Sequence, residues 1–136
     1  MKLNPYIMFS GNAEEALNFY KECLGGEISG LQRYGQAPMP SSEEDKNKLM
    51  HGVFVFDGNL VMASDGTKDH PASQGGNIHL SVDVEDVDKL EKVFSQLGEG
   101  GKIDMPLQDT FWGARFGMLT DKFGIHWMFN HELKKH

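Results

Sequence analysis

The sequence predicts an α+β protein built from two βαβββ modules, whose curved mixed sheets form around a cavity. A strand-like segment, a capped amphipathic segment and a glycine stop follow one another twice along the 136-residue chain. Three further strand-like segments follow each glycine stop. A four-stranded sheet with a helix on one face leaves its other face open, so two such sheets are expected to curve around a cavity.

The first module is expected over residues 1–66. Its first strand, Pro5–Phe9, is apolar, and Ser10-Gly11-Asn12 offers turn and N-cap residues for a helix over Ala13–Cys23. Acidic residues in the first turn suit the helix dipole, and Gly25-Gly26 ends the helix. The later strands are expected at Glu27–Tyr34, Met50–Phe56 and Leu60–Ser64, with a hairpin turn at Asp57-Gly58-Asn59.

The second module, over residues 76–131, repeats this order. A strand at Ile78–Val82 and a cap region at Asp83–Asp86 precede an amphipathic helix that ends at Gly98. Its later strands are expected at Lys102–Pro106, Ala114–Thr120 and Ile125–Asn130. Pro5 corresponds to Asn77 and Gly25 to Gly98, offsets of 72 and 73 residues. The sequence therefore indicates an internal duplication within a single domain, 1–136.

Two irregular segments and one cysteine complete the chain. Gly35–Lys48 is predicted to be a surface loop with one turn capped by Ser41 or Ser42, acting either as a lid or as a plain connection. Gly66–Gly75 is expected to link the modules. Cys23, the single cysteine, falls on the apolar helix face and is expected to be buried.

Charge and hydropathy narrow the range of partners. The formal net charge is −7, which disfavours attachment to phosphate backbones or anionic lipid, so nucleic acid and membrane partners are not expected. The sequence shows neither an apolar run of membrane-spanning length nor a signal-peptide pattern at its start. A cytoplasmic location is expected.

Several motifs resemble the vicinal oxygen chelate superfamily, which includes glyoxalases, bleomycin-resistance proteins and dioxygenases. The helix segment with Phe19-Tyr20 and Leu24-Gly25 is similar to the family's first helix, and Asp121–Gly124 to the turn before its last strand. The stretch Pro106–Arg115 resembles the PhnB-like branch, which often carries a 3-demethylubiquinone methyltransferase-like label. The resemblance implies the fold over nearly the whole chain, but one fold of this kind hosts many activities.

This resemblance also implies where a metal would bind. Superfamily enzymes typically hold one divalent metal with His and Glu side chains on the first, fourth, fifth and eighth strands. The corresponding positions here are Pro5, Met62, Asn77 and Met128. None of them carries the imidazole or carboxylate that hard and borderline cations prefer. We therefore predict no cofactor and expect the usual metal site to be absent.

Three histidines are the candidate catalytic residues. Strand alternation is expected to turn His79 and His126 toward the cavity, and His51 begins the third strand. Together they could hold a divalent metal at a non-standard site, although their spacing carries no metal signature. Alternatively, they could act as general acids or bases, or hydrogen-bond a ligand without chemistry.

Other residues are candidates for substrate binding. Arg115 could hold a carboxylate or phosphate, or pair with Asp109, Asp121 or a glutamate across a dimer. Trp112 could stack on a flat ligand, plug the cavity or cover a partner chain. The full set of candidates is Met62, Asn77, Met128, Trp112 and Arg115.

Two functions follow from these residues. The first is a glyoxalase/bleomycin-resistance-like protein of unassigned activity that binds a small molecule in the sheet cavity without the usual metal. The alternative is an enzyme of the same superfamily, an isomerase, lyase, dioxygenase or group transferase, with or without a divalent metal on the histidines. A homodimer is expected because open sheet faces and edges need covering and the resembled family usually pairs.

Overall fold

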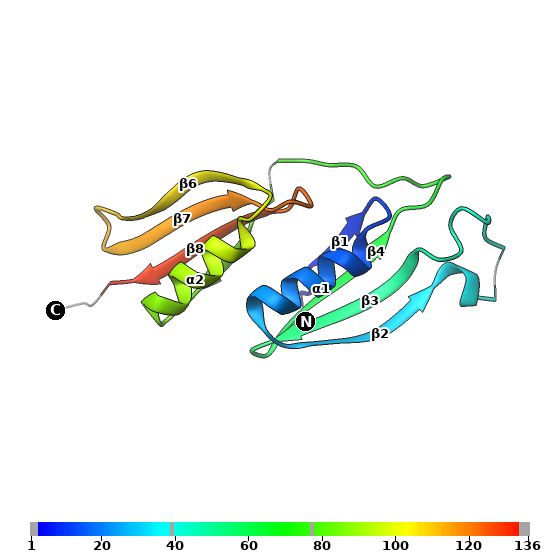
Figure 1. The fold of residues 1–136 in the computed structure, drawn as a ribbon, viewed down its shortest axis with the longest axis horizontal. Helices are drawn as coiled ribbons and strands as arrows, with labels where there is room; N and C mark the ends of the chain where they lie inside the picture. Colours follow the sequence, from blue (N-terminus) through cyan, green and yellow to red (C-terminus); the bar gives the residue numbers. More distant parts are fainter. Residues whose placement is uncertain (1–2, 39, 77, 134–136) are drawn as a thin grey trace. The chain divides into compact units, whose positions relative to one another are not determined.

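Eight strands and two α-helices make up the main regular structure of the residues described by a computed structural model, namely 3–38, 40–76 and 78–133. The chain divides into two compact units, Met1–Ser73 and Gln74–His136. The described part of each unit contains one α-helix and one four-stranded mixed sheet (Figure 1). The predicted βαβββ order is therefore confirmed in both halves.

The first unit places its last strand beside its first. Its elements are β1 (Tyr6–Phe9), α1 (Ala13–Leu24), β2 (Glu27–Arg33), the short 3-10 helix η1 (Tyr34–Gln36), β3 (Leu49–Phe56) and β4 (Asn59–Asp65). The strand order is β1-β4-β3-β2, with β1 parallel to β4 and the other neighbours antiparallel. The β3–β4 hairpin turns at Asp57 and Gly58, which have φ values of 48° and 79°. Asp and Gly are residues that tolerate this left-handed conformation.

Helix α1 covers one face of the first sheet, and its beginning differs from the prediction. Its buried positions include Leu17, Tyr20 and Cys23, as the apolar periodicity indicates. Asn12, one of the three residues predicted to supply the turn and cap, occupies the N-cap position but makes no side-chain hydrogen bond there. The buried carboxylate of Asp65, at the end of β4, instead accepts from the amide of Ala13 at 2.8 Å. A residue distant in sequence therefore caps this helix.

The second unit repeats the arrangement. Its elements are β5 (Leu80–Asp83), α2 (Val87–Leu97), β6 (Lys102–Asp109), β7 (Ala114–Thr120) and β8 (His126–Glu132), with strand order β5-β8-β7-β6. Asp86, the last residue of the predicted cap region, caps α2, because its side chain accepts from the amide of Asp88. The rings of Phe94 and Phe129 pack edge to face, with centroids 5.8 Å apart, so α2 is held against β8.

Some strand boundaries differ from the prediction for physical reasons. β6 does not stop at Pro106 but continues to Asp109. It is an edge strand whose pairing is irregular between Met105 and Gln108, and a proline at such a position breaks no regular ladder. β5 begins at Leu80 rather than Ile78, because its first ladder partner is Trp127 at the start of β8. His79 therefore lies just before the strand.

In each unit the helix covers one sheet face, and the strand side chains that alternate away from it lie on the open face. No helix among the described residues has the length and apolar character needed to span a membrane. On β8, Trp127 and Phe129 are buried toward α2, whereas Met128, between them, is only half-buried. The open face of each sheet therefore presents side chains that the helix leaves uncovered.

Candidate functional site

The open face of the first sheet brings together Tyr6, His51 and Met62. The Tyr6 hydroxyl lies 3.0 Å from His51 Nδ1, and the two ring centroids are 5.8 Å apart. Met62 pairs with Tyr6 in β1 and with Val53 in β3. The face thus joins two of the predicted residues to a tyrosine that was not selected from the sequence.

A second cluster lies at the beginning of β8 on the open face of the other sheet. The rings of His79 and His126 have centroids 5.2 Å apart. Thr120 Oγ1 lies 2.9 Å from His126 Nδ1 and donates to Asp104 Oδ2 at 2.7 Å. His126 Nε2 lies 3.2 Å from the carbonyl oxygen of Gly75. Contacts at both ring nitrogens therefore fix the orientation of His126.

His79 differs from His126 in its hydrogen bonding. Its Nδ1 is buried and has no hydrogen-bond partner among the described residues. Buried polar atoms are paired in most folded proteins, and an unpaired one costs free energy until something satisfies it. His79 Nδ1 is thus a buried polar atom that the described part of the chain leaves unsatisfied.

Apolar side chains continue this face away from the histidines. The pairing of Met118 with Met128, and of Phe116 with Asn130, places these residues beside one another across β7 and β8. Trp112 packs edge-on against Phe116, with centroids 5.9 Å apart. From His126 to Asn130 the strand rises about 13 Å, given about 3.3 Å per residue. The face therefore has a polar end, a thioether centre and an aromatic end.

Arg115 lies on the other side of this sheet, toward α2. Its Nε donates to Glu91 of α2 at 2.6 Å and its Nη1 to Asp109 of β6 at 3.2 Å. These hydrogen bonds, first the one to Glu91, raise the pKa of the Arg115 guanidinium. The ion pair with Asp109, one of the alternatives open from the sequence, is present. Arg115 is therefore not part of the open-face cluster.

The structure distributes the other predicted residues as follows. His79, His126, Met128 and Trp112 share the open face of the second unit, and Asn77 lies outside the described residues. Thr120 and Asp104 were not selected from the sequence. The position of Thr120 could have been inferred from the hairpin, because a turn over 121–125 puts it opposite His126.

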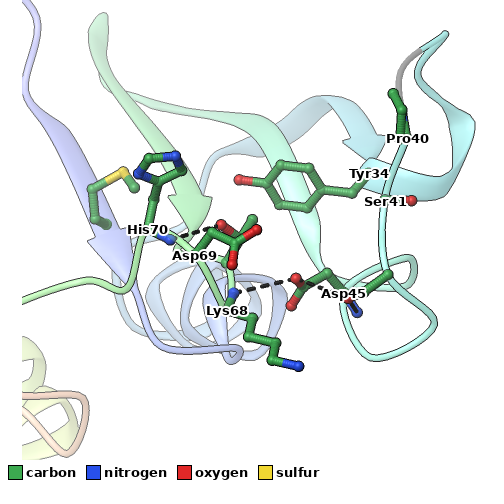
Figure 2. Close-up of a pocket in the computed structure, with 10 residues that line it drawn as sticks. Tyr34, Pro40, Ser41, Asp45, Lys68, Asp69 and His70 are labelled. Carbon is green, nitrogen blue, oxygen red and sulfur yellow. Dashed lines mark hydrogen bonds between the residues drawn. The ribbon is translucent and has the colours of Figure 1, made fainter.

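A pocket of about 310 Å³ lies within the first unit (Figure 2). One wall is the loop that follows β2, including Tyr34 and Asp45, and the other is the segment after β4, including Asp69 and His70. The Tyr34 hydroxyl donates to the Asp65 carbonyl oxygen at 2.8 Å. Burial, and then the Asp65 charge, raise the pKa of Tyr34, so this donor keeps its proton.

Asp45 joins the two walls of this pocket. It is 5% exposed, and its carboxylate accepts from Lys48 Nζ at 2.9 Å, from Ser42 Oγ at 3.0 Å and from the backbone amide of Lys68 at 3.2 Å. The backbone amide of Asp45 donates to Ser42 Oγ at 3.2 Å, so Ser42 caps the turn that the sequence predicts here. A buried aspartate in a loop rich in charged residues carries no sequence signal, so this pocket was not predicted.

We expect Asp45 to make stability depend on acid pH. The hydrogen bond from Lys48, followed by that from Lys68, holds the pKa of Asp45 below its ordinary value of 3.8. A lowered pKa in the folded state contributes stability above pH 3.8 that is lost as the pH falls through the lowered pKa. Urea midpoints measured from neutral to strongly acid pH should fall less steeply for Asp45→Asn than for the wild type. Parallel acid limbs would contradict this role.

Comparison with known proteins places the chain in a family. Residues 2–129 match the model of the Glyoxalase/Bleomycin resistance protein/Dioxygenase superfamily, and the chain belongs to that superfamily. Protein YjdN of Escherichia coli K12 is 33% identical over 140 aligned positions, covering 96% of this chain and 95% of YjdN. The family resemblance seen in the sequence is therefore confirmed.

Two solved structures share both fold and sequence similarity with the chain. Protein PA1353 from Pseudomonas aeruginosa is 37% identical, with a TM-score of 0.90 over 98% of this chain and 99% of that one. A PhnB protein from Bacillus cereus is 30% identical, with a TM-score of 0.82 over 96% of this chain and 99% of that one. These matches confirm the predicted fold class and its PhnB-like relatives.

The donor set at the family's metal positions does not fit a divalent metal. Pro5 lacks a donor side chain, and Met62 and Met128 offer soft thioethers, which borderline cations such as Zn²⁺ disfavour. Within the described residues, no group of three or more His, Cys, Asp or Glu side chains is arranged to hold a metal ion. The reactive groups on the open sheet faces are therefore imidazole, hydroxyl and thioether groups.

Proposed function

We propose that this protein binds an amphipathic small molecule on the open face of the β5-β8-β7-β6 sheet, without a divalent metal at the family's usual positions. The observation that carries the proposal is the pair His79–His126, in which His79 Nδ1 is buried and finds no hydrogen-bond partner in the described part of the chain. A ligand hydroxyl, amine or carbonyl can satisfy that nitrogen when the side chains that cover it move aside, because a ring nitrogen of histidine can serve as a donor or an acceptor.

The rest of the face supports an amphipathic ligand. Thioethers of Met118 and Met128 adapt to irregular apolar shapes, and Trp112 offers an aromatic surface that is 58% exposed. Small-molecule sites commonly combine apolar lining with a few well-placed polar groups. A ligand with one polar end and an apolar body matches this order of side chains.

We expect amphipathic fragments to bind this face, as measured by amide NMR spectra of the full chain. Binders should shift the amides of β7 and β8. His79→Phe, which keeps a ring but removes both nitrogens, should lower the affinity for these fragments about tenfold through loss of a buried hydrogen bond. His70→Phe in the first unit serves as the control and should leave their affinity unchanged.

The same titration tests the role of metal. The affinity of the protein for each fragment should be the same in the presence of a chelator as in the presence of added zinc, nickel, manganese or iron(II). Binding that disappears with chelator and returns with one equivalent of metal would overturn the metal-free proposal and favour a metalloenzyme. Fragments that shift only residues outside β7 and β8 would overturn the site itself.

The alternative function, catalysis on the same fold, rests on a different observation. Thr120 and Asp104 orient the His126 imidazole in a chain of hydrogen bonds, an arrangement that suits a general acid or base. Turnover with a bell-shaped pH profile, abolished by His126→Ala or His79→Ala, would favour an enzyme. Saturable binding without turnover would favour the binding protein.

Other expectations from the sequence stay predictions. They concern a homodimer, a cytoplasmic location, the single domain 1–136 with its modules at 1–66 and 76–131, and the ligand contacts of Asn77 and Arg115. The catalytic role of His51 is among them. Its contact with Tyr6 supports a positioned imidazole on the first sheet.

A further inference from the structure

The pocket between the loop after β2 and the segment after β4 is distinct from the site proposed above. All its lining residues belong to the first unit, and none lies on the β5-β8-β7-β6 sheet. Its volume of about 310 Å³ is at the lower end of the range for ligand pockets. The pocket is therefore formed by the first unit alone.

Hydrogen bonds hold both walls of this pocket in place. Asp45 accepts from Ser42 within the first wall and from the Lys68 amide in the second. In the second wall, the amide of Thr67 donates to the His70 carbonyl and the amide of His70 to Thr67 Oγ1, which closes a tight turn. A site built this way needs little ordering when a ligand enters, and this favours affinity.

The described charged side chains around the pocket leave one negative charge, that of Asp69, uncompensated inside it. Lys48 neutralises Asp45 in a 2.9 Å ion pair. The ammonium group of Lys68 is directed away from the space between the walls, whereas the Asp69 carboxylate is directed toward it (Figure 2). Asp69 has no ion-pair partner among the described residues, and the whole chain has a net charge of −7. The interior therefore attracts cations.

The remaining lining suits an organic cation rather than a bare metal ion. The Tyr34 ring and the side chains of Met8 and Pro40 contribute apolar surface. An aromatic face attracts an ammonium group that loses part of its water shell. Asp69 and Tyr34 thus combine a counter-charge with a π surface.

We propose that this pocket binds a small organic ammonium ion with an apolar body. Asp69 pairs with the ammonium group, Tyr34 offers its ring, and Asp45 acts as a positioning residue that holds the walls. This inference goes beyond the ligand proposed for the second sheet and uses none of its residues. One site can fail while the other stands.

Three probes of nearly equal shape test the charge preference in the full wild-type chain: benzylammonium, benzyl alcohol and benzoate, at matched ionic strength. Amide NMR spectra should show saturable shifts at Tyr34, Lys68 and His70 with benzylammonium, weaker shifts with the alcohol and none with benzoate. Benzoate that binds as tightly as benzylammonium would overturn the proposal, and this comparison requires no variant.

A matched pair of variants then tests the counter-ion. Asp69→Asn should weaken benzylammonium binding about tenfold, because a charge-assisted contact is replaced by a neutral one. Glu22→Gln removes the same charge from the exposed face of α1 and so measures the effect of net charge alone. It should leave the affinity for benzylammonium unchanged. Equal losses in the two variants, or none in Asp69→Asn, would overturn the role of Asp69.

Discussion

Replacing Asp65 with alanine is expected to lower the free energy of unfolding by about 3–5 kcal/mol, since it strands several buried donors at once. The carboxylate is 2% exposed. It accepts from the amides of Gly11 and Ala13 at 2.9 and 2.8 Å and from that of Leu49 at 2.8 Å. Asp65 therefore ties the end of β4 to the start of α1 and the start of β3.

The matched control is the cap of the other helix. Asp86 accepts one amide bond at the exposed start of α2, and Asp86→Ala should cost about 1 kcal/mol, the usual loss for a helix cap. Urea unfolding followed by far-ultraviolet circular dichroism measures both variants. Equal losses would show that Asp65 acts only as a cap and that its bond to β3 contributes nothing.

The contrast between these two caps shows what the sequence could and could not predict. The cap region Asp83–Asp86, which contains Asp86, was identified because a local pattern, acidic residues before an apolar periodic segment, directly encodes a cap. Asp65 caps α1 across 52 residues, and its role depends on β4 lying beside β1. The helix, the strands and the glycine stops were predictable because each follows from residues within a few positions.

The candidate site shows the same limit. Strand alternation placed His126 and Met128 on the open face, and the structure agrees. It assigned His79 to a strand, whereas the chain enters β5 only at Leu80. The pocket around Asp45 and Asp69 forms from two segments that have no periodicity, so only the folded chain reveals it.

Asp121 connects the stability of the second unit to its proposed site. It is 3% exposed, and its Oδ1 accepts from the amides of Phe123 at 2.8 Å and Ile125 at 3.1 Å. Its Oδ2 accepts from the indole of Trp127 at 2.8 Å. The turn fixed by these bonds leads directly into His126. The Asp121 carboxylate therefore determines where β8 begins and where the His126 imidazole lies.

Asp121→Asn should lower the free energy of unfolding by about 2–4 kcal/mol. The carboxylate accepts hydrogen bonds through both oxygens, whereas asparagine replaces one oxygen by an NH2 group, which would face a donor and leave that donor unsatisfied. Asp88→Asn, the same change on the exposed side of α2, should stay within about 0.5 kcal/mol. Urea unfolding gives both values. Binding of fragments to β7 and β8 should weaken in Asp121→Asn even where the protein is folded, since the turn no longer fixes His126. Undiminished binding in a destabilised variant would show instead that the ligand face is set by the sheet alone.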